Sequence, residues 1–192
     1  MASKSKKTQK KPIRCAENEA DFSIRKEEYF TALRNHPIPK INNNSTLSII
    51  YSTKQAKPET QIAIYKNISF FEAVNRIATD LVFWQGINEV LENLSWDKIE
   101  KIEYCLGNEN SPDHGDFTIK LKSEDKEELE GEVFFAAPSY FPTKMRNTLE
   151  KWEEDKKLRY VLFNSNAASE DNIQKLTENN PNISFISVEL SE

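Results

Sequence analysis

Two acidic residues stand in neighbouring predicted strands, where they could act on one ligand. Asp116 opens the segment 115–121, and Glu132 lies within the segment 129–137. Apolar and polar residues alternate in both segments, and Val, Ile, Thr and Phe are frequent, which is typical of strands. The segment between them, Ser123 to Glu128, suits a hairpin with a longer loop, so the two strands are expected to be sheet neighbours and the two acids to lie near each other. Two carboxylates at adjacent positions are costly to bury without a cation, which makes the pair a candidate divalent-metal site.

Mg²⁺ is the cation whose chemistry such a pair fits. It prefers oxygen ligands in octahedral array and commonly takes one or two carboxylates together with waters and phosphate oxygens. An ion held by Asp116 and Glu132 would neutralise charge that develops on a scissile phosphate and lower the pKa of a bound water. A lysine beside the ion would orient that water or help to deprotonate it.

The same strands offer a structural alternative. Side-chain alternation puts Glu130 on the face of Glu132, and Lys120 on the face of Asp116. Acids and lysines on a solvent-facing strand can simply pair with one another, and exposed pairs contribute only about 0–1 kcal/mol. Both interpretations remain open at the level of the sequence.

Composition describes an ordinary globular chain. It has 192 residues, 38% hydrophobic and 30% charged, which corresponds to one domain with a sizeable core. No apolar run approaches 18 residues and no apolar stretch follows the basic N-terminus, so neither a membrane span nor a secretory signal is expected. Cys15 and Cys105 have no CxxC partners, which argues against a zinc site and a disulfide framework. A cytoplasmic location is expected.

Charge divides the chain into two parts. The first fourteen residues carry six positive charges, whereas the net charge of the whole chain is −5, so the remainder is strongly acidic. A basic arm of this kind could contact nucleic-acid phosphates, or it could be a disordered solubilising tail. Three regions are predicted: a basic tail over 1–20, an N-terminal helix and β-hairpin over 21–68, and an α/β domain over 69–192.

The order of the predicted elements indicates an α/β fold. The N-terminal region is expected to contain a helix over 22–35 and strands over 47–53 and 61–67. Ser69 and Glu72 form a capping box before a long helix that reaches about Leu94. The elements expected after this helix are, in order, strands over 99–106, 115–121 and 129–137, a helix over 143–155, a strand over 158–163, a helix from Ser169 and a strand over 183–190. Three meandering strands and a helical crossover give a mixed sheet flanked by helices.

This element order, together with Gly115-Asp116 and Glu132-Val133-Phe134, resembles the PD-(D/E)xK restriction-endonuclease-like nucleases. The resemblance covers about residues 69–165 and implies an αβββαβ core in which Asp116 and Glu132 hold Mg²⁺. The family's lysine usually stands two residues after the glutamate, where this chain has Phe134. Some members carry that lysine on the next helix, for which Lys144 is the match. The family also often uses an acid from the first helix, for which Glu89 is the match.

The function that follows from this resemblance is Mg²⁺-dependent endonuclease hydrolysis of DNA, of the restriction or defence type. RNA as the substrate is left open, as are a homodimer and a partner protein. The alternative is a nuclease-fold module without catalysis that binds nucleic acid or protein. His114 could ligate metal or phosphate, although a turn histidine is more often simply exposed. Trp84 and Trp152 lie on apolar helical stripes and are expected in the core.

Overall fold

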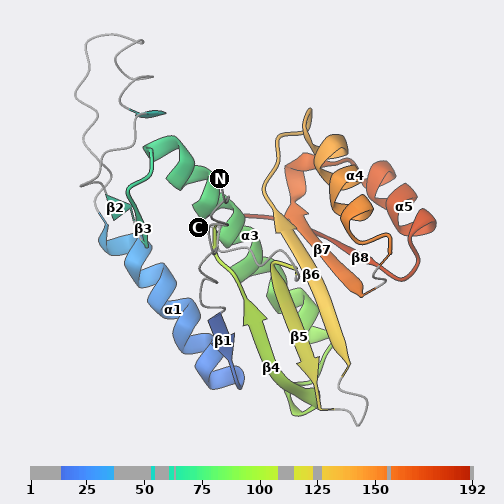
Figure 1. Cartoon of the computed structure of the whole chain (residues 1–192), viewed down its shortest axis with the longest axis horizontal. Helices are drawn as coiled ribbons and strands as arrows, with labels where there is room; N and C mark the ends of the chain where they lie inside the picture. Colours follow the sequence, from blue (N-terminus) through green and yellow to red (C-terminus); the bar gives the residue numbers. More distant parts are fainter. Residues whose placement is uncertain are drawn as a thin grey trace, which may run out of the picture.

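A six-stranded mixed sheet forms the centre of the computed structural model (Figure 1). The structure describes residues 14–36, 53–54, 61–62, 64–107, 115–122, 127–154 and 157–190. The strand order is β1-β4-β5-β6-β7-β8. The pairs β1–β4, β4–β5 and β5–β6 are antiparallel, and the pairs β6–β7 and β7–β8 are parallel. The strands are β1 (Arg14–Ala16), β4 (Ile99–Tyr104), β5 (Phe117–Leu121), β6 (Glu128–Phe134), β7 (Leu158–Asn164) and β8 (Ser184–Val188). The predicted α/β architecture with a mixed sheet is confirmed.

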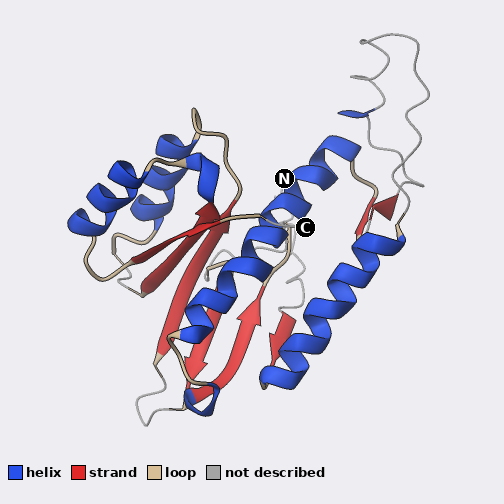
Figure 2. Ribbon diagram, turned by 180° about the vertical axis from the view of Figure 1, so that it is seen from behind, coloured by secondary structure: helices blue, strands red, loops and turns tan. Residues whose placement is uncertain are grey.

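Helices cover the two faces of this sheet unequally. The helices α1 (Glu19–Asn35) and α3 (Phe70–Glu92) lie on one face, and α4 (Phe141–Lys151) and α5 (Glu170–Asn179) lie on the other, over β7 and β8 (Figures 1 and 2). On this second face, β4 and β5 have no helix in front of them (Figure 1). None of the described helices is both long and apolar enough to cross a membrane.

Alternation along β7 separates two hydrophobic cores. Leu162 points to the core under α1 and α3, whereas Val161 and Phe163 point to the core under α4 and α5, and all three are fully buried. A strand buried on both faces reads as a nearly continuous apolar run, as residues 158–163 do. The larger core also contains Trp84, and the smaller one contains Trp152, which confirms the prediction for both tryptophans.

The helix starts follow local sequence signals. Ser69 Oγ accepts a hydrogen bond of 3.1 Å from the backbone N–H of Glu72, so the predicted N-cap of α3 is confirmed. Asn18 caps α1 in the same way, through a 2.9 Å bond from the N–H of Asp21. Pro142 stands in the first turn of α4, where its missing N–H costs no helical hydrogen bond.

The N-terminal region is more integrated than predicted. Arg14–Ala16 is not part of a tail but forms β1, which pairs with β4 at the edge of the sheet. Phe22 and Tyr29 of α1 are buried in the larger core, so this helix belongs to the main domain and not to an appendage. Three residues are too few to give a strand signal, because β1 depends on the edge that β4 offers.

The predicted N-terminal hairpin is different from the observed one. Residues 47–52 lie outside the described residues, as do residues 1–13 of the basic arm. The segment predicted as a single strand over 61–67 instead folds back on itself, with β2 (Gln61–Ile62) antiparallel to β3 (Tyr65–Lys66). Asn67, which follows β3, has a positive φ of 59°.

Asp80 is a buried acid within α3. It is only 1% exposed, and its carboxylate accepts hydrogen bonds from the hydroxyls of Tyr29 (2.8 Å) and Tyr65 and from the N–H of Gly107 (2.9 Å). Gly107 has a φ of +60°, which favours glycine. The buried carboxylate therefore joins α1, β3, α3 and the chain after β4 through satisfied hydrogen bonds.

Phe117 and Gly131 form a cross-strand pair between β5 and β6. The Phe117 ring covers Gly131, so that a Cβ atom at Gly131 would lie 2.0 Å from the ring. Both residues are buried, which leaves the ring little room to move.

Gly131→Ala is therefore expected to destabilise the fold, by about 1–3 kcal/mol, because the added methyl group overpacks this contact. Urea denaturation followed by circular dichroism measures the loss. The matched control is the same substitution in a Phe117→Leu background, where the smaller side chain should remove much of the penalty. Equal losses in the two backgrounds would show that the ring contact is not the cause.

Candidate active site

Asp116 and Glu132 face each other across the β5–β6 pair. The antiparallel register joins Phe117 with Gly131, so the residue before Phe117 stands opposite the residue after Gly131. Residues directly opposite one another in an antiparallel pair share a sheet face. Asp116 directly precedes β5 and Glu132 lies on β6, so the prediction that neighbouring strands bring the two acids near each other is confirmed.

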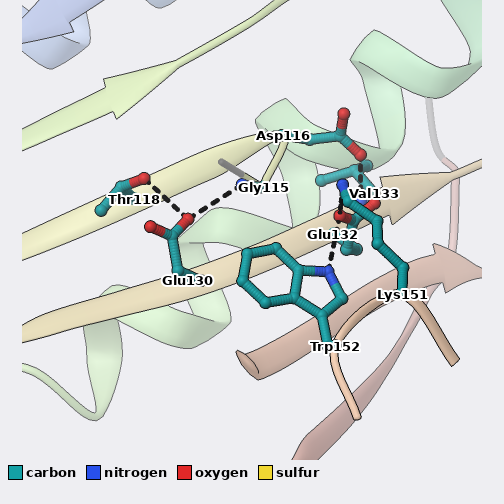
Figure 3. A network of polar contacts seen from close by, with 8 residues as sticks. All are labelled: Gly115, Asp116, Thr118, Glu130, Glu132, Val133, Lys151 and Trp152. Atoms are coloured by element: carbon teal, nitrogen blue, oxygen red, sulfur yellow. Dashed lines mark hydrogen bonds and ion pairs between the residues drawn. The ribbon is translucent and has the colours of Figure 1, made fainter. Parts of the chain in front are cut away.

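Three donors hold the two carboxylates (Figure 3). The backbone N–H of Val133 donates to Asp116 Oδ2 at 2.8 Å. Glu132 Oε1 accepts from Lys151 Nζ at 2.5 Å and from Trp152 Nε1 at 2.8 Å. Glu132 is 6% exposed and the Lys151 side chain is 44% exposed, so the ion pair has one end in the protein and one end in water.

The charge state of Asp116 is unusual for a carboxyl group. Burial, followed by the negative charge of Glu132, raises its pKa from 3.8 to about 7. The Val133 N–H and the ammonium groups of Lys151 and Lys144 act in the opposite direction and only partly compensate. The site therefore lacks positive charge near neutral pH, and a cation between the carboxylates would supply it.

Glu130, which the sequence placed on the face of Glu132, supports the site. It is 2% exposed, and its Oε2 accepts from the N–H of Gly115 at 3.0 Å and from the hydroxyl of Thr118 at 2.9 Å. These bonds fix the chain on both sides of Asp116 (Figure 3). Lys120, which the sequence placed on the face of Asp116, forms ion pairs with Glu103 (3.3 Å) and Glu128 (3.1 Å) on the face that no helix covers.

Lys144, the predicted family lysine, lies near the site without touching either acid. Its Nζ is 5.6 Å from the centre of the Phe134 ring, and its charge lowers the pKa of Asp116. Phe134 itself is 3% exposed and packs on Phe141 and Phe163 in the smaller core. The position where the family usually has its lysine is thus a packing position in this chain.

Lys151 and Trp152 are the site residues that the sequence did not reveal. Lys144, Thr148 and Lys151 recur at intervals of four and three residues, so they share one face of α4. Thr148 is buried, which shows that this face is turned toward the protein. The signal for Lys151 in the sequence was its position seven residues after Lys144, which puts both lysines on one helix face. The helix was predicted over 143–155, so the sequence did not show that α4 ends at Lys151.

Glu89, a further candidate, is not brought to the pair. Glu89 is exposed on α3, and among the described residues no three His, Cys, Asp or Glu side chains form a group that could hold a metal ion. Glu89 therefore does not complete a three-carboxylate site with Asp116 and Glu132. His114 lies outside the described residues.

A cleft of about 970 Å³ lies next to the site, between α4 and α5. Met145, Leu149 and Leu176 contribute to an apolar lining, and Trp152 lines the cleft while its indole N–H donates to Glu132. Neither acid of the pair lines the cleft, so it is separate from the carboxylates and does not carry their chemistry.

Comparison with known proteins identified no matching family model, no matching curated protein and no matching solved structure.

The raised pKa of Asp116 predicts how stability depends on pH. The folded state keeps this proton up to about pH 7, whereas an unfolded chain releases it near pH 3.8, so this contribution to stability is complete below about pH 4 and is lost as the pH rises through 7. Asp116→Asn cannot titrate, yet its amide oxygen can still accept from Val133. We expect the variant to gain about 1–3 kcal/mol over the parent between pH 5 and pH 8.

Urea denaturation at a series of pH values measures this difference. Glu132→Gln removes the second of the two causes, so the decline should become smaller in that variant without disappearing. Parallel stability profiles for the parent and Asp116→Asn would show that Asp116 has an ordinary pKa.

Proposed function

We propose that this chain is a Mg²⁺-dependent endonuclease that hydrolyses DNA phosphodiester bonds, with Asp116 and Glu132 as its metal-binding residues. The observation that carries the proposal is the deficit of positive charge at this pair, where burial and mutual repulsion keep Asp116 protonated up to about pH 7. A divalent cation relieves that deficit, and the pair's oxygen chemistry suits Mg²⁺.

The donor set fits such an ion. The second oxygen of Asp116, Oδ1, points away from Val133 and contacts no described residue through a hydrogen bond or ion pair (Figure 3). At Glu132, Lys151 and Trp152 both bind Oε1, which leaves Oε2. One oxygen from each carboxylate is therefore left for a metal, with water and phosphate oxygens as its remaining ligands.

The residues around the pair have separate roles in this proposal. The bound ion would supply charge neutralisation at the phosphate and a more acidic water. Trp152 and Lys151 hold Glu132 in place through their contacts with Oε1. Lys144 is the proposed catalytic lysine, which orients the attacking water, and its helix begins nine residues after Glu132. The mixed sheet with helices on both faces agrees with the nuclease-like core that the sequence resembles.

A second function is favoured by one specific observation. Lys151 already supplies a cation to Glu132, and Phe134 replaces the usual lysine within a packed core. A chain in which these contacts have replaced the metal would be a nuclease-fold module that binds nucleic acid or protein without cleavage.

Plasmid cleavage separates the two functions. We expect purified full-length protein to nick or linearise supercoiled DNA with Mg²⁺ and not with EDTA, because the ion completes the site. Asp116→Ala and Glu132→Ala should each abolish cleavage. Glu128→Gln is the matched control, since Glu128 lies on the same strand and face but pairs with Lys120, and it should cleave at the parental rate.

Absence of cleavage by the parent with Mg²⁺ or Mn²⁺ would contradict the nuclease proposal and favour the binding module. Loss of cleavage in Glu128→Gln as well would indicate a general structural effect in place of a specific one.

The two lysines can be distinguished by their kinetics. Lys144→Met should lower kcat by about 10²-fold or more with little change in DNA binding, because a water-orienting lysine acts mainly in the transition state. Lys151→Met should also weaken metal binding, since Glu132 loses a contact that orients its carboxylate. Single-turnover rates and Mg²⁺ titrations measure both effects. A Lys144→Met variant with the parental rate would remove Lys144 from the mechanism.

A further inference from the structure

The cleft between α4 and α5 has an apolar lining that no side chain of the described residues fills. Its volume of about 970 Å³ is typical of small-molecule sites, which measure about 300–1,000 Å³. Leu149, Leu176 and Ile183 line it and are half-buried, whereas Met145 and Trp152 line it and are buried. No residue of α5 is buried, so this helix borders the cleft without closing it. An apolar ligand in the cleft would remove this lining from water.

The wall that α5 contributes is positively charged. Lys175 lines the cleft, as do Asn172, three residues before it, and Asn179, four residues after it, so the three side chains share one helix face. Within the part of the chain that the structure describes, none of these three side chains has a hydrogen bond or an ion pair. An ammonium group between two amide groups, which can each donate, suits an anionic group on the ligand.

The charges on the rest of the lining cancel. Arg146 and Glu150 of α4 form an exposed ion pair of 3.8 Å. Arg159 of β7 and Glu153, which follows α4, also line the cleft. Lys175 is therefore the excess charge of the lining, although the whole chain has a net charge of −5. A positive cleft in an acidic chain attracts anions to this one place.

Trp152 connects the cleft with the carboxylate pair. It lines the cleft, and its indole N–H donates to Glu132 Oε1 at 2.8 Å (Figure 3). Trp84 and Trp96, in contrast, belong to the larger core on the other face of the sheet. The indole N–H of Trp152 can therefore report on a ligand in the cleft, and the other two tryptophans serve as internal references.

We propose that the cleft binds a single-chain amphiphile with an anionic head group, of which a fatty-acid carboxylate is the simplest example. The hydrocarbon chain lies on the apolar lining, and the head group lies at Lys175 between the two asparagines. Burial of the chain supplies the affinity, and Lys175 selects the sign of the head-group charge. Neither Asp116 nor Glu132 lines the cleft, so this inference does not rest on the proposed nuclease activity.

Isothermal titration calorimetry of the full-length protein with dodecanoate, below its critical micelle concentration, tests the site. We expect about one dodecanoate per chain, binding of dodecyltrimethylammonium that is weaker by about tenfold or more, and no binding of acetate. Lys175→Glu should weaken dodecanoate binding by about tenfold or more, because repulsion replaces attraction. Lys98→Glu is the matched control, since Lys98 is exposed just before β4 and outside the cleft, and it should bind as the parent does.

The indole ¹H–¹⁵N signal of Trp152, assigned from Trp152→Phe, gives a second readout. Dodecanoate should shift this signal and leave those of Trp84 and Trp96 in place. Leu176→Gln should also weaken binding, and the fold should tolerate it because no residue of α5 is buried.

A parent that does not bind dodecanoate would overturn the proposal, as would equal affinity for the two amphiphiles, which indicates unselective adsorption. Parental affinity in Lys175→Glu would remove the head-group site. Binding without a shift of the Trp152 signal would place the amphiphile outside the cleft.

Discussion

The main physical constraint on this structure is that two carboxylates lie close together in a partly buried site, where their charges are costly in free energy. Asp116 and Glu132 meet across β5 and β6, and the protein supplies an ammonium group, an indole N–H and a backbone N–H to hold them. These donors do not fully compensate, since the pKa of Asp116 still rises to about 7. A protein that served only stability would replace such a pair with apolar residues, because that exchange is often neutral or favourable. The retained deficit of positive charge is therefore the basis for proposing a metal-dependent function.

The surrounding fold is arranged around this pair at several levels. Gly131 leaves room for the Phe117 ring, which occupies the space that a Cβ atom at Gly131 would need. Glu130 lies two residues before Glu132 on β6. It holds the chain on both sides of Asp116 by accepting hydrogen bonds from Gly115 and Thr118. The crossover through α4 then brings its last turn back over the end of β6, where it contributes the ammonium and indole groups. Each of these supports is buried or anchored, which keeps the site in one geometry.

Much of this could be predicted from the sequence, because it depends on local patterns. Alternation in β5 and β6 and the hairpin connection between them were sufficient to predict that Asp116 and Glu132 lie near each other on neighbouring strands. Lys151 could not be identified in the same way, since its contact depends on where α4 ends and how it packs on the sheet. Asp80 was missed for a related reason: its partners come from α1, β3 and the chain after β4, and a helical pattern does not show them. Local periodicity therefore predicts the strands and helices, whereas the contacts of Lys151 and Asp80 depend on packing between elements that are distant in the sequence.

The charge state of Asp116 with and without Mg²⁺ tests the central claim most directly. A ¹³C-detected NMR titration of the side-chain carboxyl groups, with the Asp116 resonance assigned from Asp116→Asn, measures its pKa in the full-length protein. The account predicts a pKa of about 7 without metal and a value lower by more than about one unit with saturating Mg²⁺, because a bound cation favours the carboxylate. A pKa near 4 without metal, or a raised pKa that Mg²⁺ does not change, would contradict it.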